Sequence, residues 1–210
     1  KGKGSVIMER LICVLVGYVF GLIQTGYIYG KKNGVDLRKK GSGNAGTTNA
    51  LRTMGWKAGA VTLLGDCFKC VAAVVVVHLI YGKTHTDMMP LLSMYAGMGA
   101  VLGHNYPFYL KFKGGKGIAA TAGLIISTTN IWIVLICLAT FIVIVAATRY
   151  VSLGSMTVVT IYLISVIVYG QHGGFGVENV SYLHEMYGVA AFLMILAFWR
   201  HRANIKRLLS

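Results

Sequence analysis

The stretch GIAATAGLIISTTNIWIVLICLATFIVIVAAT, residues 117–148, runs for 32 residues without a charged side chain. As one helix it would be roughly 48 Å long, whereas the hydrocarbon core of a bilayer is about 30 Å thick. The polar cluster Ser127-Thr128-Thr129-Asn130 near its middle is typical of a turn. We therefore expect two short membrane-spanning helices here, joined at this cluster.

The distribution of Lys and Arg supports two crossings, because the cytoplasmic loops of membrane proteins carry an excess of these residues. With two crossings the chain has seven spans, and 15 Lys and Arg residues fall on one side against four on the other. A single crossing would leave ten against nine. The four on the sparse side are Lys1, Lys3, Arg10 and Lys83, while Lys69 lies within a span. We therefore place the N-terminus outside and the C-terminus in the cytoplasm.

Five further apolar stretches complete the spans, and all but the last are close to the length of about 20 residues that a crossing helix needs. They are residues 11–30, 58–80, 88–110, 152–169 and 187–199. The predicted fold is an all-α integral membrane protein with about seven transmembrane helices in a single domain, residues 1–210. The spans near Ile118 and Val189 are expected to be short or broken.

The composition agrees with a membrane protein. Hydrophobic residues make up 56% of the chain and charged residues 12%, about half the usual charged share. The net charge of +14 would indicate nucleic-acid binding in a soluble protein. Here the positive charge lies between apolar runs, so the expected partners are anionic membrane lipid and phosphorylated substrates, and not nucleic acid.

Two local features receive no functional role. Cys67 and Cys70 form a C-x-x-C pair within an apolar span, and without a second pair this favours packing over a metal or redox site. The first apolar run is too long for a cleavable signal peptide. Residues 1–7, ahead of Met8, are expected to derive from expression of the protein.

The first cytoplasmic loop, about residues 31–57, carries GSGNAGTTNALR at positions 41–52. This matches the dinucleotide fingerprint G-x-G-x-x-G, but no strand precedes it and no βαβ unit fits before the next span. Its glycines let backbone N–H groups approach an anion, Ser42 and Asn44 offer hydrogen bonds, and Arg52 can grip a phosphate with two bonds. A turn anchored to lipid headgroups is the alternative reading.

The second cytoplasmic loop, residues 103–117, reads GHNYPFYLKFKGGKG. Free backbone N–H groups of Gly114 and Gly115, the start of a helix and the Lys111 and Lys116 ammonium groups together predict an anion site. The spacing is not that of a Walker loop. The alternative is a basic anchor at the membrane surface.

Two shorter segments, residues 148–155 and 200–210, complete the cytoplasmic face. Ser152 could face the same site, and His201 and Asn204 share one helix face. Taken alone, the serine is more typical of helix packing and the tail of a basic end that binds lipid. Basic neighbours should keep His201 neutral and able to accept a proton. Within the second span, Asp66 and Lys69 lie three residues apart, and a pair that holds the helices together is favoured over a catalytic role.

These motifs resemble those of the bacterial PlsY family, membrane acyltransferases that acylate glycerol 3-phosphate with acyl phosphate. The likeness covers about residues 21–208. It rests on Asp36-x-Arg38, the motif at 41–52, Asp66-x-x-Lys69, the motif at 103–117, TRYVSLGS at 148–155 and HRANIKRL at 201–208. The chain departs from the family at residues 21–26, at Cys70 in place of glycine, and at Ala203 in place of a frequent glutamate.

The loops and the resemblance together imply a set of site residues on the cytoplasmic side of the bacterial cytoplasmic membrane. Catalytic roles are expected for Ser42, Arg52, His104, Ser152, His201 and Asn204. Phosphate binding is expected for Gly43, Asn44, Gly46, Asn49, Lys111, Gly114, Gly115 and Lys116. The expected substrates are acyl phosphate and glycerol 3-phosphate, the expected product is lysophosphatidic acid, and no metal or cofactor is expected. The proton acceptor is either His201 or the phosphate of the donor, and the chain is expected to be a monomer.

Other function classes fit the residues less well. The acyltransferase motif H-x-x-x-x-D is absent from the sequence, and a metal-dependent phosphotransferase needs clustered acids where the cytoplasmic loops have only Asp36. A transporter for a small organic phosphate should place its polar site near the middle of the membrane. Here the motifs lie at one interface, and a scaffold protein would not need several anion-binding loops.

Overall fold

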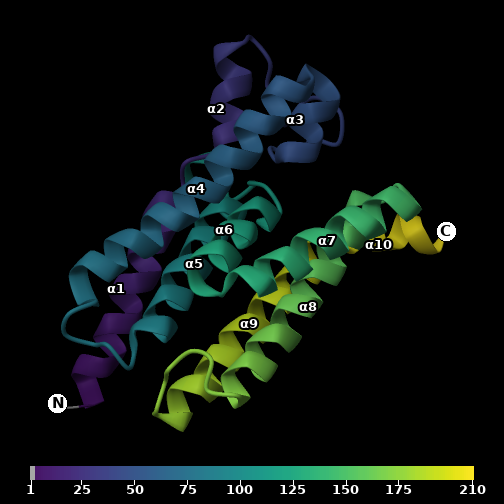
Figure 1. Ribbon diagram of the computed structural model, residues 1–210. Helices are drawn as coiled ribbons and strands as arrows, with labels where there is room; N and C mark the ends of the chain where they lie inside the picture. Colours follow the sequence, from purple (N-terminus) through teal and green to yellow (C-terminus); the bar gives the residue numbers. More distant parts are fainter. Residues whose placement is uncertain (1–2) are drawn as a thin grey trace.

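The computed structural model describes residues 3–210, and within this range every secondary-structure element is a helix (Figure 1). Residues 1–2, which belong to the segment set aside above, lie outside the described range. The helices are α1 (Lys3–Gly21), α2 (Thr25–Lys32), α3 (Thr47–Met54), α4 (Trp56–Tyr81), α5 (Met89–Asn105), the short 3-10 helix η1 (Phe108–Leu110), α6 (Ile118–Thr128), α7 (Ile131–Thr148), α8 (Val151–Gln171), α9 (Val180–Arg200) and α10 (Arg202–Leu209). The predicted all-α fold is confirmed.

The break predicted within residues 117–148 is present between α6 and α7. Asn130 caps α7, since its side-chain oxygen accepts a hydrogen bond from the Ile133 backbone N–H at 3.0 Å. Helix α6 has 11 residues and a length of about 16 Å, so it is too short to cross the hydrocarbon core as a straight helix. By length and composition, five segments of the described chain can cross a membrane: Ile7–Lys32, Trp56–Tyr81, Ile131–Thr148, Val151–Gln171 and Val180–Arg200.

The first predicted span is not one continuous helix, which corrects the expectation for residues 11–30. The helix breaks between Gly21 and Thr25. The Gln24 side chain is buried there, and its amide nitrogen lies 3.2 Å from the Gly21 carbonyl oxygen, 3.4 Å from that of Gly103 and 3.1 Å from that of His104. One buried amide thus satisfies backbone oxygens that the break and the end of α5 leave exposed.

Two other predicted spans have different limits. Helix α5 ends at Asn105, and the rest of the span predicted over 88–110 is a turn followed by η1. The last span is longer than predicted, since α9 covers Val180–Arg200 with 21 residues. The polar residues of its first turn hid this extension from a hydropathy argument.

Close helix packing centres on α5, which contacts α1, α4, α6 and α9. Gly21 of α1 meets Gly103 of α5, and a Cβ atom at Gly17 would lie 1.9 Å from the Ala96 carbonyl oxygen. On α5, a Cβ atom at Gly99 would lie 2.2 Å from the Val14 carbonyl oxygen. Pairs of small residues four apart let two membrane helices approach closely. This contact fixes the C-terminal end of α5, which carries the second motif loop.

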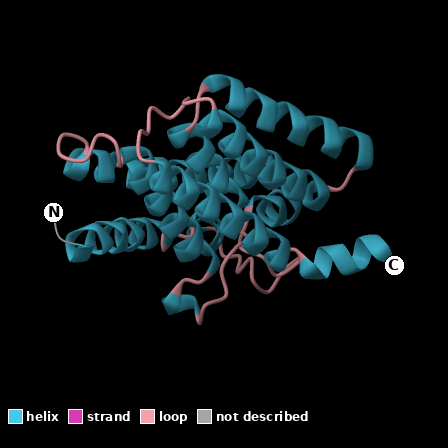
Figure 2. Ribbon diagram, turned by 90° about the horizontal axis from the view of Figure 1, so that it is seen from below, coloured by secondary structure: helices cyan, strands magenta, loops and turns pink. Residues whose placement is uncertain are grey.

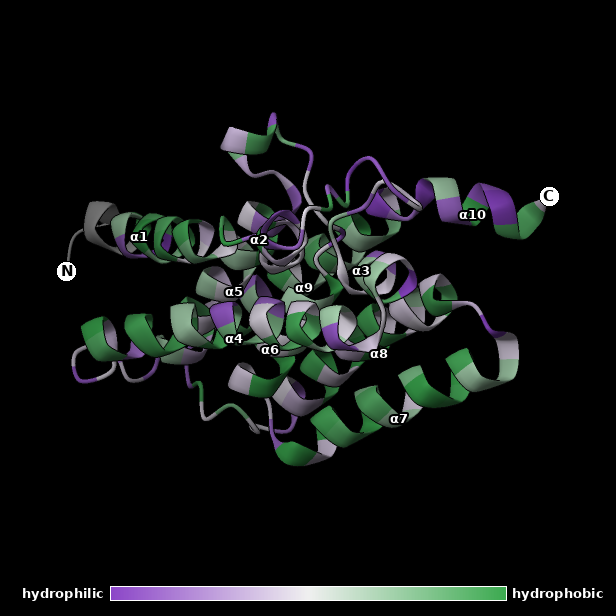
Figure 3. Cartoon of the chain, turned by 90° about the horizontal axis from the view of Figure 1, so that it is seen from above, coloured by the Kyte–Doolittle hydropathy of each residue, from purple (hydrophilic) through white to green (hydrophobic). Residues whose placement is uncertain are grey.

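The outer surface of the bundle is apolar. Figure 3 shows hydrophobic residues along the outward sides of α1, α4 and α7, and polar residues mainly in the loops and in α10. On α7, the Trp132 side chain is 71% exposed, and Ile136, Ile142 and Val143 are also exposed. Such an apolar belt suits contact with lipid. Helix α10 projects away from the bundle at the same end as the motif loops (Figures 1 and 2).

Candidate functional site

A cleft of about 480 Å³ joins segments that are far apart in the sequence. The first motif loop, the second motif loop and the last residue of α9 all contribute to its wall. The lining residues are Asp36, Arg38, Lys39, Ser42, Gly43, Asn44, Lys113, Gly114 and Arg200. The structure therefore brings together Ser42, Gly43, Asn44 and Gly114 of the predicted site. Four cations of the wall, at positions 38, 39, 113 and 200, were absent from the predicted set.

The first motif loop is built around the side chain of Asn49, which is 2% exposed. Its oxygen accepts a hydrogen bond from the Ser42 backbone N–H at 2.9 Å. Its nitrogen lies within 2.9 to 3.0 Å of the carbonyl oxygens of Leu37, Lys40 and Asn44. The amide is fully engaged within the loop, so the structure places Asn49 as the residue that shapes the loop and not as a direct phosphate ligand.

Within this loop Asn44 and Gly46 form a tight turn, in which the Asn44 side-chain oxygen accepts a hydrogen bond from the Gly46 N–H at 2.8 Å. Gly43 has φ +70°, a conformation that favours glycine. The turn leaves the Ser42 side chain exposed at the cleft. A short, exposed hydroxyl at this position can reach a phosphate oxygen.

The Asp36 and Arg38 pair forms the far wall of the cleft. Nε and one terminal nitrogen of Arg38 each donate a hydrogen bond to a different Asp36 oxygen at 3.1 Å. These bonds lower the pKa of the Asp36 carboxyl. The Arg38 guanidinium also lies 4.6 Å from the centre of the Tyr27 ring. Because Asp36 offsets the charge of Arg38, the excess positive charge of the wall belongs to Lys39, Lys113 and Arg200.

The second motif loop is docked onto the end of α5. The Gly114 N–H donates to the Asn105 carbonyl and the Gly115 N–H to the His104 carbonyl, both at 3.1 Å. These two donors are therefore not free for an anion, which corrects the expectation from the sequence. A Cβ atom at Gly115 would lie 1.9 Å from Nε2 of His104, so only glycine permits this approach. The second loop requires glycine at these positions because its backbone packs directly against His104.

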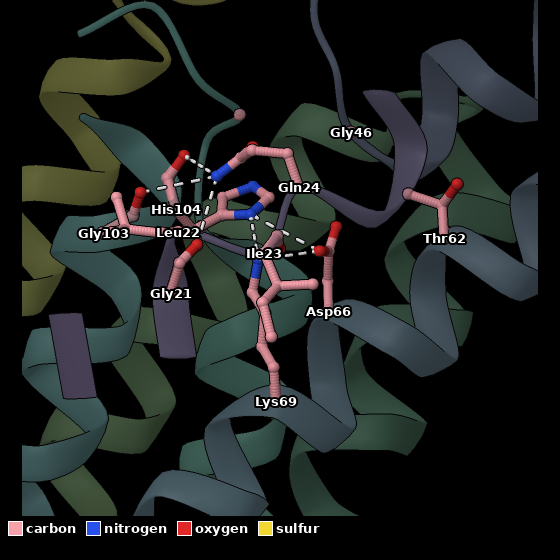
Figure 4. Close-up of polar contacts among 12 residues, drawn as sticks. Gly21, Leu22, Ile23, Gln24, Gly46, Thr62, Asp66, Lys69, Gly103 and His104 are labelled. Carbon is pink, nitrogen blue, oxygen red and sulfur yellow. Dashed lines mark hydrogen bonds and ion pairs between the residues drawn. The ribbon is translucent and has the colours of Figure 1, made fainter. Parts of the chain in front are cut away.

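His104 does not line the cleft. It takes part in a cluster of polar contacts with Lys69 and Asp66 (Figure 4). The side chain is 3% exposed, and Nδ1 lies 2.8 Å from Nζ of Lys69 and 3.6 Å from an Asp66 oxygen. Lys69 also donates to Asp66 at 2.8 Å and to the Ile23 carbonyl at 2.6 Å. The predicted pairing of Asp66 with Lys69 is confirmed. This buried cluster ties α4 to the break after α1 and to the residue on which Gly115 rests.

The tail brings His201 next to the second loop. His201 is 3% exposed, and its Nδ1 lies 2.8 Å from the Ala197 carbonyl oxygen. Since a carbonyl only accepts, Nδ1 carries the hydrogen and Nε2 keeps its lone pair. Burial, together with the positive charge of Lys116, lowers the pKa of His201 to about 4. Its imidazole is therefore a neutral proton acceptor near pH 7.

Lys116 joins this group from the loop side. Its ammonium donates a short hydrogen bond to the side-chain oxygen of Asn204. Burial and the neighbouring Arg207 and Arg200 lower the pKa of Lys116 to about 8. The sequence prediction that Lys116, His201 and Asn204 belong to one site agrees with this geometry.

Arg200 is the main residue that the sequence argument missed. One terminal nitrogen donates to the carbonyls of Gly114 at 3.1 Å and Gly115 at 2.7 Å. The guanidinium lies 5.1 Å from the centre of the Tyr106 ring. The only signal in the sequence is an arginine that ends an apolar span directly before His201.

Other predicted residues do not line the cleft. Arg52 is exposed on α3, Lys111 is exposed with φ +54°, and Ser152 is half-buried in the first turn of α8. No group of three His, Cys, Asp or Glu residues that could hold a metal ion occurs within the described residues. Cys67 and Cys70 are free thiols within α4.

Comparison with known proteins decides the family. The sequence model of the glycerol-3-phosphate acyltransferase family matches residues 11–210. The chain belongs to the glycerol-3-phosphate acyltransferase family. A member from Clostridioides difficile is 42% identical over 205 residues, which cover 97% of this chain and 94% of that protein. A member from Bacillus subtilis is 37% identical over 202 residues, with 95% and 93% covered.

Solved structures of the family share the fold. PlsY, an integral membrane glycerol 3-phosphate acyltransferase, has a crystal structure in its glycerol 3-phosphate form with 32% identity and a TM-score of 0.81, covering 95% of this chain and 92% of that one. Its lysophosphatidic acid form gives 30% identity and a TM-score of 0.79, with 95% and 91% covered. The resemblance to the PlsY family, the acyltransferase class that it implies and a multi-pass membrane protein are confirmed.

Proposed function

We propose that the chain transfers an acyl group from acyl phosphate to the 1-hydroxyl of sn-glycerol 3-phosphate, which gives 1-acyl-sn-glycerol 3-phosphate and inorganic phosphate. The observation that carries the proposal is the cationic cleft of about 480 Å³ at one end of an apolar helix bundle. A phosphorylated, water-soluble acceptor can enter such a cleft from the loops, while the acyl chain of the donor stays beside the lipid-facing helices. The forms in which PlsY has been solved support both the acceptor and the product.

In this reaction the first loop and the second loop each hold a phosphate. The groups proposed to contact the phosphates are Ser42, the backbone of Gly43 and Asn44, and the ammonium of Lys116. The first turn of α6 adds backbone N–H groups and the positive end of its dipole behind Lys116. Arg52 and Lys111 do not line the cleft and are proposed to act through their positive charge alone.

The chemical step needs little beyond positioning and charge stabilisation, because phosphate is a good leaving group. The hydroxyl oxygen of the acceptor forms a bond to the acyl carbon, and the bond between that carbon and the donor's phosphate oxygen breaks. The hydroxyl proton passes to Nε2 of His201, which is neutral and unbonded to the Ala197 carbonyl. The departing phosphate is the alternative acceptor of this proton, and Asn204 positions Lys116 beside the reaction.

We place the cleft on the cytoplasmic side of the bacterial cytoplasmic membrane, in a monomer with about seven crossings. The 15 Lys and Arg residues assigned to that side support the orientation. Helix α6 is too short to cross the membrane alone. It would complete a crossing together with the polar turn at Ser127–Asn130, where the neighbouring helices shield the backbone from lipid. Labelling of single cysteines at Lys83 and Ser210 with a membrane-impermeant maleimide, in a background without native cysteines, tests this: only the Lys83 position should react in intact cells.

The donor is tested with purified protein, labelled glycerol 3-phosphate, and palmitoyl phosphate, palmitoyl-CoA or palmitoyl carrier protein. Labelled lysophosphatidic acid from palmitoyl phosphate alone is the expected result. Product from one of the thioesters would overturn the proposed donor but not the acceptor. If folded protein gives no product with any donor, flux of glycerol 3-phosphate into sealed proteoliposomes would instead support a transporter.

A further inference from the structure

We infer that Arg200 is a positioning residue, which covers the carbonyl oxygens of Gly114 and Gly115 so that the cleft presents positive charge to a phosphorylated substrate. The inference rests on the proposed function and assigns a role that neither the motif spacing nor the resemblance gave to this residue. It concerns the wall of the cleft between the second loop and the end of α9.

The geometry of the loop creates a problem for anion binding. The Gly115 N–H points to the end of α5, so the Gly114 carbonyl, on the opposite side of the same peptide group, turns toward α9. The Gly115 carbonyl also faces Arg200 of α9. Gly114 itself lines the cleft. Two carbonyl oxygens carry partial negative charge and would repel a phosphate at this wall.

The Arg200 guanidinium neutralises both oxygens. Its terminal nitrogen donates to both oxygens, at 3.1 and 2.7 Å, and its planar guanidinium lies against the Tyr106 ring. The wall then shows the cation and not the two oxygens. Lysine has the charge but lacks the planar fork and the stacking surface, so it is a poor substitute.

A second observation shows that the arginine is held at this place against its own hydrogen-bonding needs. Nε of Arg200 is buried and has no hydrogen-bond partner among residues 3–210. A buried donor without a partner destabilises the fold, and such compromises concentrate at functional sites. Residues at this end of α9 that only anchored the helix to headgroups would instead keep every donor in water.

Arg202 provides a matched control two residues away. It carries the same charge, is exposed, and donates a hydrogen bond to the Trp199 carbonyl at 3.1 Å while its guanidinium lies over the Trp199 ring. Arg200→Gln, Arg200→Lys and Arg202→Gln therefore separate the contact with the loop from the charge of the tail. Arg200→Lys also keeps the inference testable if the glutamine variant does not fold.

The experiment measures binding of glycerol 3-phosphate by calorimetry, and kcat and KM with palmitoyl phosphate as donor, from pH 6 to pH 10. Arg200→Gln should weaken binding of glycerol 3-phosphate and raise KM on the order of ten- to a hundred-fold, the loss expected for charge-assisted hydrogen bonds. The affinity and KM of Arg200→Lys should lie between those of Arg200→Gln and wild type. Those of Arg202→Gln should stay within about two-fold of the wild-type values. The alkaline limb of the pH profile, set by Lys116, should move to higher pH in Arg200→Gln alone.

Each contrary result has a distinct meaning. Unchanged binding and KM in a folded Arg200→Gln protein, or an equal loss in Arg202→Gln, would overturn the role of Arg200. A lower melting temperature with unchanged KM and pH profile would reduce Arg200 to a structural residue. If wild type binds glycerol 3-phosphate without turnover, the proposed reaction fails while the binding comparison still decides the role of Arg200.

Discussion

At the scale of single residues, His201 offers the clearest test of the chemistry. Its Nδ1 is committed to the Ala197 carbonyl and its pKa is lowered to about 4, so Nε2 is an available base throughout the neutral range. In His201→Gln, the glutamine side chain is similar in size and can form hydrogen bonds, but its amide cannot act as a base. We expect kcat to fall by roughly a hundred-fold or more with a small change in KM. Near-normal turnover would instead assign the proton to the departing phosphate.

Lys116 predicts a pH dependence with a defined sign. The pKa of about 8 belongs to the free site, and the ammonium that attracts phosphate is lost as pH rises through this value. KM for glycerol 3-phosphate should therefore be flat below about pH 7 and rise up to about ten-fold per unit well above pH 8. Lys116→Arg keeps the charge to much higher pH, so its profile should lose this limb even if its activity is lower. An identical alkaline limb in Lys116→Arg would assign the limb to another group.

At the scale of elements, Gly115 links the second loop to α5. Since a Cβ atom at this position would lie 1.9 Å from Nε2 of His104, Gly115→Ala must displace the loop or the imidazole. We expect a loss of about 1–3 kcal/mol in stability and a larger loss of activity. Thermal unfolding in detergent and turnover should be compared with those of Gly188→Ala in α9. A Cβ atom at Gly188 would meet no neighbouring part of the described structure within 4 Å. A Gly115→Ala protein as stable and active as this control would contradict the proposed docking.

Hydropathy and charge distribution predicted most of the helices, including the break at Ser127–Asn130, because these signals are local in the sequence. The break before Thr25 was missed, since Gln24 can replace the lost backbone bonds only with α5 beside it. For the same reason the N–H groups of Gly114 and Gly115 were expected to be free. Their partners are the last carbonyls of α5, which no local pattern reveals.

The candidate site shows the same division between local and distant information. Ser42 and Asn44 were predicted from turn chemistry, and His201 with Asn204 from helical spacing. Arg200 looked like one more basic anchor at the end of a span. Its role depends on two carbonyl oxygens about 85 residues away in the chain, and only the folded loop turns them toward it.

At the scale of the whole molecule, the Asp66 and Lys69 pair joins three helical segments in the interior of the bundle. Both side chains are nearly fully buried, and Lys69 also bonds to the Ile23 carbonyl and to His104. Asp66→Ala leaves the buried Lys69 ammonium without a carboxylate partner. We therefore expect the free energy of unfolding to fall by about 3–5 kcal/mol. The double variant Asp66→Ala with Lys69→Met removes both charges and should recover part of this stability, because it abolishes the unpaired charge.

Thermal unfolding of the four proteins of this cycle, in one detergent, measures the coupling between the two charges. Activity should follow a different order, since Lys69 also holds His104, on which Gly115 and the cleft rest. The double variant should therefore be more stable than Asp66→Ala yet remain less active than wild type at a temperature where all four are folded. If both single variants and the double variant unfold at the wild-type temperature, the buried pair does not hold the bundle together. If the double variant regains full activity, the cluster stabilises the helices without positioning the cleft.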